Sequence, residues 1–261
     1  MFGSIVLQDI PKEEVQIDLA YIPIQGGFRG FSMVPPSSWH YVSVKHGDYY
    51  EGFWCWLNVE EVVVKRFDPD RGFINPDPAA IEHYTHLARS GAMGPALREY
   101  PHEFFGSWYG LVMHLGAENF PPPLHDRDRP VAESRFLNAL MGTHSGDAKA
   151  FLGEFQYAFI SWLISLDTEH EATAAFDRWF QLLLAIYNAG EFNMRDHADL
   201  FSKLVDLLIR QFSCLADSYF ESDSWLIEQV DYLLEDLADT ELPELMNKSQ
   251  VLRDYLNQRY S

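Results

Sequence analysis

The sequence contains few cysteines and few cations, and each shortage argues against a class of protein. Cys55 and Cys214 are the two cysteines in 261 residues. A pair so far apart in sequence provides no disulfide framework and fits a reducing compartment. Lys and Arg total 19 against 39 Asp and Glu, a formal net charge of −20. Binding of nucleic acid needs a basic surface, so the acidity instead favours solubility or a basic protein partner.

Long apolar runs and phosphate-binding motifs are also missing. No stretch approaches the roughly 18 apolar residues of a membrane span, and the start, MFGSIVLQDIPKEE, lacks the basic and apolar regions of a signal peptide. The motifs G-x-x-x-x-G-K-[ST], G-x-G-x-x-G and G-x-S-x-G do not occur. We therefore expect no membrane, no cofactor and no catalytic residue, and the chain is predicted not to be an enzyme.

One histidine cluster offers a weak alternative. Glu82, His83 and His86 fall within IEHYTHLA, and a metal-dependent hydrolase is the function they would serve. Hydrolytic zinc helices instead place two histidines at i and i+4 with the glutamate between them, so exposed or capping histidines are the simpler interpretation. Cys55 stands between two tryptophans in a predicted strand, which favours a packed, inert thiol.

The first part of the chain has the pattern of β-structure. Short strands are expected over residues 4–7, 14–18, 39–44, 51–57 and 62–67, the last three as a meander. Alternation in EGFWCWL covers both faces of its strand, which indicates a sandwich or a sheet backed by helices. Residues 68–78 are expected to form a loop because of their Asp, Asn, Pro and Gly content.

Helical periodicity follows, interrupted by one linker. Helices are expected over residues 79–89 and 104–115, and then over 151–166, 176–187, 200–212, 225–237 and 244–259, with Ser222 or Asp223 capping the fourth of these last five. ENFPPPLHDRDRPVAES, residues 118–134, combines proline and charge as linkers do. The prediction is an α+β chain with an N-terminal β-rich domain (1–120), a linker (121–147) and a C-terminal helical domain (148–261). Any exposed tryptophan is a candidate binding anchor.

The segment GGFRGFSMVPPSSW has a stiffened backbone. Its glycines permit positive φ, and Pro35 and Pro36 fix φ and push the preceding residue away from helix. Arg29 can donate hydrogen bonds to several loop carbonyls or to a carboxylate. We expect a rigid crossover that leads into the strand at Trp39, with a structural role for Arg29.

The same segment resembles a known family. FRGFSMVPPSSWHYVSV is similar to the F-R-G and P-P-G signature of the AAR-two (AAR2) family of splicing factors, which makes Phe28, Arg29, Gly30, Pro35 and Pro36 its signature residues. IVLQDIPKEEVQID resembles the family's opening, GFWCWLN with VVVKRFD its hairpin, and REYPHEFFGSWYGL its helix with Y-P and W-x-x-L. FLGEFQYAFISWLI and AFDRWFQLLLAI resemble its paired C-terminal helices.

The resemblance implies a β-rich N-terminal domain, a VHS-like helical domain and a non-enzymatic chaperoning role. Family members assemble the U5 small nuclear ribonucleoprotein, and they clamp the ribonuclease-H-like region of the large scaffold protein Prp8. For this chain we expect a cytoplasmic location, with the nucleus as a second compartment. Three features depart from the family pattern: Ser37 stands where the family has Gly, the linker is short, and little tail follows the last helix. A compact homologue from an organism without a spliceosome, with another protein partner, is the alternative.

Overall fold

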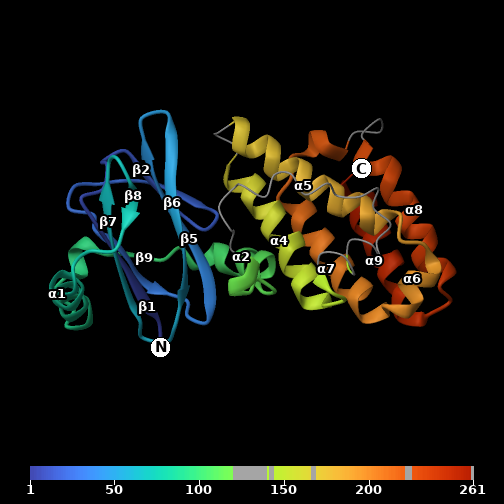
Figure 1. Cartoon of the computed structure of the whole chain (residues 1–261), viewed down its shortest axis with the longest axis horizontal. Coiled ribbons are helices and arrows are strands. Elements are labelled where there is room, and N and C mark those ends of the chain that lie inside the picture. Colours follow the sequence, from blue (N-terminus) through green and yellow to red (C-terminus); the bar gives the residue numbers. More distant parts are fainter. Residues whose placement is uncertain (120–139, 141–143, 166–168, 221–224, 260–261) are drawn as a thin grey trace. The chain divides into compact units, whose positions relative to one another are not determined.

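The computed structural model describes residues 1–119, 140, 144–165, 169–220 and 225–259. The chain divides into two compact units, Met1–Met113 and His114–Ser261. The first contains the β-sheets and the second is helical (Figure 1), so the expected α+β class is confirmed. Most of the expected linker, 121–147, lies outside the described residues.

Two sheets form the first unit. One has the strand order β8-β7-β1-β4-β9 and the other β3-β2-β5-β6. The strands are β1 (Gly3–Gln8), β2 (Glu14–Ile17), β3 (Ala20–Pro23), β4 (Gly30–Val34), β5 (Ser38–His46), β6 (Tyr49–Leu57), β7 (Val62–Asp68), β8 (Gly72–Ile74) and β9 (Arg98–Glu99). One hydrophobic core draws buried residues from both sheets, as the predicted sandwich requires.

A helix covers the outer face of each sheet. Helix α1 (Pro78–Arg89) packs Ile81, Tyr84 and Leu87 against a small cluster on β1 and β7. Helix α2 (Phe105–Val112) lies against β5 and β6, where the Trp108 ring stacks on Trp54 with centroids 5.7 Å apart. Sheets backed by helices were one of the two arrangements that the alternating tryptophans indicated.

Three sequence-based expectations for this unit are wrong in detail. The expected meander ends at β6, because β7 leaves that sheet and pairs in parallel with β1. The segment expected as a crossover contains β4, which pairs with β1 and β9. The expected loop 68–78 contains β8, paired with β7. The first two errors concern pairing between strands that are distant in sequence, which local composition does not specify. The third concerns a hairpin, because β8 pairs with the strand that comes directly before it in the chain.

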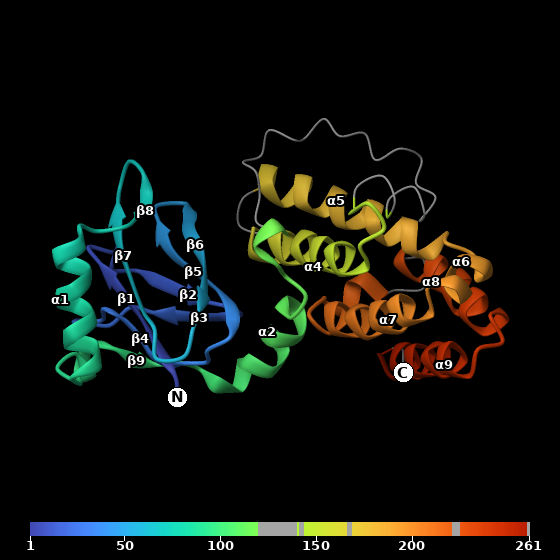
Figure 2. The same ribbon diagram turned by 60° about the horizontal axis from the view of Figure 1, so that its bottom comes forward.

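The second unit packs helices around an aromatic core. Its helices are α4 (Ala148–Ile164), α5 (Glu169–Tyr187), α6 (Glu191–Asp196), α7 (Ala198–Ser213), α8 (Trp225–Asp239) and α9 (Pro243–Arg259). Helices α4 and α5 run side by side (Figure 2), and the Trp162 and Trp179 rings stack between them. The short α6 was not predicted, and the expected caps Ser222 and Asp223 lie outside the described residues.

None of the helices in the described ranges combines the length and the apolar character of a segment that crosses a membrane.

Candidate functional site

The signature segment, residues 28–36, is tied into the first unit mainly through its backbone. The main chain of Arg29 accepts a hydrogen bond from the Leu7 amide and donates one to the Ala96 carbonyl, both 2.8 Å. Gly30 has φ 130°, and a Cβ there would lie 2.0 Å from the Ile5 carbonyl oxygen. Glycine is the residue that fits such a close approach at positive φ.

The side chains of the signature point to different surroundings. Phe28 packs against the core of the sandwich, and Pro35 is buried. Pro36 is half-buried, and the side chain of Arg29 is exposed. Within the described part of the chain, no hydrogen bond or ion pair involves the Arg29 guanidinium.

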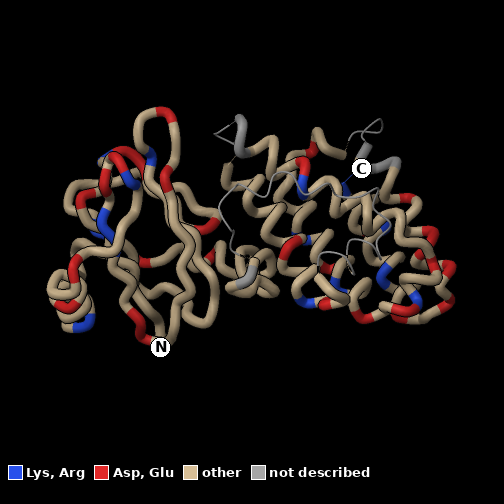
Figure 3. Tube along the Cα trace, in the orientation of Figure 1, with Lys and Arg blue, Asp and Glu red and all other residues tan. Residues whose placement is uncertain are grey.

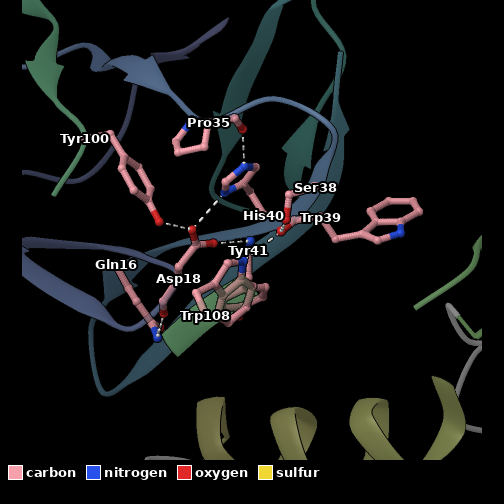
Figure 4. Close-up of polar contacts among 9 residues, drawn as sticks. All are labelled: Gln16, Asp18, Pro35, Ser38, Trp39, His40, Tyr41, Tyr100 and Trp108. Carbon is pink, nitrogen blue, oxygen red and sulfur yellow. Dashed lines mark hydrogen bonds and ion pairs between the residues drawn. The ribbon is translucent and has the colours of Figure 1, made fainter. Parts of the chain in front are cut away.

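Behind this segment lies a buried polar cluster centred on Asp18 (Figure 4). Asp18 occupies the turn between β2 and β3 with φ 54°, a conformation that aspartate tolerates better than most residues. Its Oδ2 accepts hydrogen bonds from His40 Nδ1 at 2.8 Å and from the Tyr100 hydroxyl at 2.7 Å. Its Oδ1 accepts one from the Tyr41 amide at 3.0 Å. The cluster therefore joins a turn, a central strand and the chain after β9.

The contacts of His40 require a doubly protonated ring. Its Nε2 lies 2.7 Å from the carbonyl oxygen of Pro35, while Nδ1 faces the Asp18 carboxylate. Both partners are acceptors, so each ring nitrogen must carry a hydrogen to satisfy them. Burial alone lowers the pKa of His40, but the Asp18 charge and the hydrogen bonds from both ring nitrogens raise the pKa above its ordinary value.

The geometry assigns this cluster a holding role. His40 is fully buried, and its two ring nitrogens are both engaged, so neither is free to accept a proton from a nucleophile. The Asp18–His40 pair instead holds the backbone of Pro35 in place. The signature segment is thus held at Pro35 by the Asp18–His40 pair and at Arg29 by backbone hydrogen bonds to Leu7 of β1 and to Ala96.

The structure places Glu82, His83 and His86 on the solvent-facing side of α1, where all three are exposed. A surface hollow is lined by Glu82 and His86 together with Arg89, but not by His83. In the ranges that the structure describes, no three His, Cys, Asp or Glu side chains lie close enough to share a metal ion. The adjacent cation of Arg89 also opposes metal binding.

Neither cysteine has the surroundings of a reactive thiol. Cys55 is buried on β6, and burial raises the pKa of its thiol to about 12. Cys214 is half-buried at the end of α7, and burial again raises its pKa. Thiols with raised pKa values carry little thiolate at neutral pH.

The remaining candidates are exposed aromatic side chains. Trp56, at the end of β6, is 41% exposed and donates a hydrogen bond from Nε1 to Asn58. On the second unit, Phe192 and Tyr232 are 70% and 60% exposed. Large exposed aromatics are the side chains that most often anchor protein partners. Trp56 thus meets the sequence-based criterion for an anchor, whereas the other two were not singled out.

Sequence reasoning also missed Asp18, His40 and Tyr100. They are separated by 22 and 82 residues, so no spacing rule connects them. One signal was present, namely a histidine inside the strand WHYVSV with aromatic and β-branched neighbours. A histidine in such a buried setting needs polar partners, which directs the search to acidic residues in turns.

Comparison with known proteins agrees with this division into two units. The family model described as AAR2 N-terminal domain matches residues 2–120, and the one described as AAR2 C-terminal repeat region matches residues 128–261. No curated protein matches the sequence. The two family matches follow one another in the family's own order and cover nearly all of the chain. The chain therefore belongs to the AAR2 family.

Proposed function

We propose that this protein is a non-enzymatic assembly factor that binds the ribonuclease-H-like region of the spliceosomal scaffold Prp8 during maturation of the U5 particle. The observation that carries this proposal is the match of both AAR2 family models along the chain. Family membership supports a splicing-related assembly role, and the choice of scaffold region comes from the resemblance of the signature motifs.

The chemistry of the chain is consistent with binding. In the part of the chain that the structure describes, the buried cluster of Asp18, His40 and Tyr100 has its polar groups hydrogen-bonded to one another and to the backbone. The formal charge of −20 repels RNA and attracts cationic protein surfaces. A protein that occupies a surface otherwise used by RNA benefits from this charge, because it competes with RNA without binding it.

Isothermal titration of the full chain with the recombinant ribonuclease-H-like region from the source organism tests the proposal. We expect a saturable one-to-one complex that is stable enough to co-elute in gel filtration. A neighbouring scaffold region of similar size and charge serves as the control. Absence of binding to the first region, or equal binding to both, would overturn the proposed partner and favour a compact homologue with another protein partner.

Metal analysis tests the rival hydrolase hypothesis separately. The purified chain is dialysed against zinc or manganese and then measured by plasma mass spectrometry. Stoichiometric metal that disappears in a His83→Ala or His86→Ala variant would favour the hydrolase. We expect no stoichiometric metal, because His83 does not line the hollow that contains Glu82 and His86.

A further inference from the structure

Two aromatic side chains stand out at one end of the helical unit. Phe192 on α6 and Tyr232 on α8 are the most exposed aromatic residues in the described part of the chain, at 70% and 60%. Helices α6 and α8 contact one another. The guanidinium carbon of Arg195 lies 6.0 Å from the centroid of the Phe192 ring, and Phe192 is nevertheless mostly exposed.

The short helix α6 is firmly held against α8. The amide of Gly190, at its start, donates a hydrogen bond to Asp236, and Met194 in its middle is fully buried. At its end, Arg195 Nε donates a hydrogen bond of 3.0 Å to the carbonyl of Thr240. Phe192 is therefore presented on a backbone fixed at both ends, which lowers the entropic cost of binding through its ring.

Tyr232 belongs to the same corner. It precedes Asp236 by four residues on α8, and residues at i and i+4 are neighbours on one helix face. Since Asp236 bonds Gly190 at the start of α6, Tyr232 lies one turn beyond that junction. Phe192 follows Gly190 by two residues on α6, and Tyr232 precedes Asp236 by four residues on α8, so both stand on the two helices that contact one another here. We call these two residues, with the acids around them, the α6–α8 corner.

The corner carries a large excess of negative charge (Figure 3). One cation, Arg195, stands in the segments 191–196 and 231–244, and its guanidinium bonds the carbonyls of Asp239 and Thr240. The acids of the corner are Glu191, Asp196, Asp231, Glu235, Asp236, Asp239, Glu241 and Glu244.

Four of these carboxylates interact with one another, namely Asp236 with Glu191, Glu235 and Asp239. Burial raises the pKa of Asp236, and the charges of Asp239, Glu191 and Glu235 raise it further. The repulsion is a standing cost to the folded chain, and a bound cation would relieve it.

We propose that the α6–α8 corner docks a Lys- or Arg-bearing segment of the protein partner, with Phe192 as the anchor and Tyr232 beside it. Charge complementarity selects this occupant, because the acids attract cations and the exposed rings accept cation–π contacts from Arg and Lys. A second copy of this chain is disfavoured, since it would bring its own charge of −20 to an acidic surface. This inference rests on the proposed function only for the identity of the partner.

The test uses the full chain and two probes. The first is the recombinant ribonuclease-H-like scaffold region, measured by isothermal titration. The second is a fluorescein-labelled peptide made only of Arg, Lys and Leu, measured by anisotropy over a series of NaCl concentrations, with a Glu-for-Arg/Lys peptide as its control. The variants are Phe192→Ala, Tyr232→Ala and Glu235→Lys. The matched controls on the first unit are Phe104→Ala and Glu82→Lys, each an exposed residue.

We expect Phe192→Ala to weaken binding of both probes about tenfold or more, as loss of an anchor does. Glu235→Lys should weaken both and reduce the dependence on salt, whereas the control variants should stay within about twofold of wild type, as exposed residues away from the contact do. Tyr232→Ala should lie between Phe192→Ala and the controls.

The two probes separate the two proposals. If the basic peptide binds through Phe192 but the scaffold region does not bind, the docking surface stands and the proposed partner fails. If the scaffold region binds and the Phe192 and Glu235 variants match wild type, the partner stands and the docking surface is overturned. Failure of both probes to bind overturns the docking surface as well.

Discussion

Replacing His40 by alanine should strongly destabilise the first unit. The substitution removes the cation that faces the Asp18 carboxylate and the donor that satisfies the Pro35 carbonyl. Both groups then stay buried without that partner, because Asp18 keeps only the hydrogen bonds from Tyr100 and Tyr41. The loss of the imidazole also leaves a cavity in a fully buried site.

The magnitude follows from these contacts. Removal of one partner from a buried ion pair costs about 3–5 kcal/mol, because the other charge stays buried. For a unit of this size we expect the melting temperature to fall by roughly 10 °C or more. Replacement of Asp18 by asparagine should cost less, about 1.5–3 kcal/mol, because asparagine tolerates the positive φ and retains hydrogen-bonding groups at both side-chain positions.

Urea unfolding of the two single variants and the double variant measures the interaction free energy between Asp18 and His40. Hydrogen exchange of peptides from β2 and β5 assigns the loss to the first unit, and His83→Ala on α1 controls for loss of an exposed histidine. We expect the loss of unfolding free energy in the double variant to be smaller than the sum of the two single losses by at least about 1 kcal/mol. A His40→Ala loss below about 1 kcal/mol, with additive effects, would refute the ion-pair argument.

Four further predictions follow from the same unit and the linker. The pKa of His40 is raised in the folded state, so the stabilising contribution of His40 is complete below the ordinary pKa of about 6.5 and is lost as pH rises through the folded pKa. The difference in unfolding free energy between wild type and His40→Ala should therefore fall above neutral pH in urea titrations. A difference that stays constant with pH would contradict this. Gly30→Ala should cost more than about 2 kcal/mol, because of positive φ and backbone overlap, which calorimetry would detect. Arg29→Ala should change stability by less than about 0.5 kcal/mol, and a larger loss on melting would reveal a contact. Limited trypsin digestion should first cut within residues 118–134, where proline and charge favour an accessible chain. The helical C-terminal fragment that remains should bind the scaffold weakly or not at all. First cleavage elsewhere would contradict the linker prediction.

The parts of the fold that were predicted correctly are those that local pattern specifies. The strand expected over 39–44 occurs as β5 and the one over 51–57 as β6, because aromatic and β-branched residues alternate there between two covered faces. The helix expected over 79–89 begins at Pro78, with Asp77 accepting a hydrogen bond from the Ala80 amide, which is an ordinary N-cap.

The parts that were missed depend on contacts between distant segments. Strand β4 lies in GFSMV, which holds glycine and a Met33 at φ 57°, so its composition does not favour a strand. It forms because β1 and β9 flank it on both sides. The Asp18–His40 pair was missed for the same reason, since an acid in a turn and a histidine in a strand are individually unremarkable.

The signature segment illustrates why a motif does not separate fold from function. Gly30 and Pro35 face the interior, one against the Ile5 carbonyl and the other through its own carbonyl to His40. Arg29 is exposed, although its neighbours Phe28 and Gly30 are half-buried and buried, respectively. The structural role expected for Arg29 requires hydrogen-bond acceptors for its guanidinium. Within the described residues, no acceptor bonds this guanidinium. The backbone hydrogen bonds on either side already fix the loop, so the charge of Arg29 is available at the surface. Titration of the Arg29→Ala variant with the scaffold region, together with its melting curve, tests whether Arg29 takes part in partner binding.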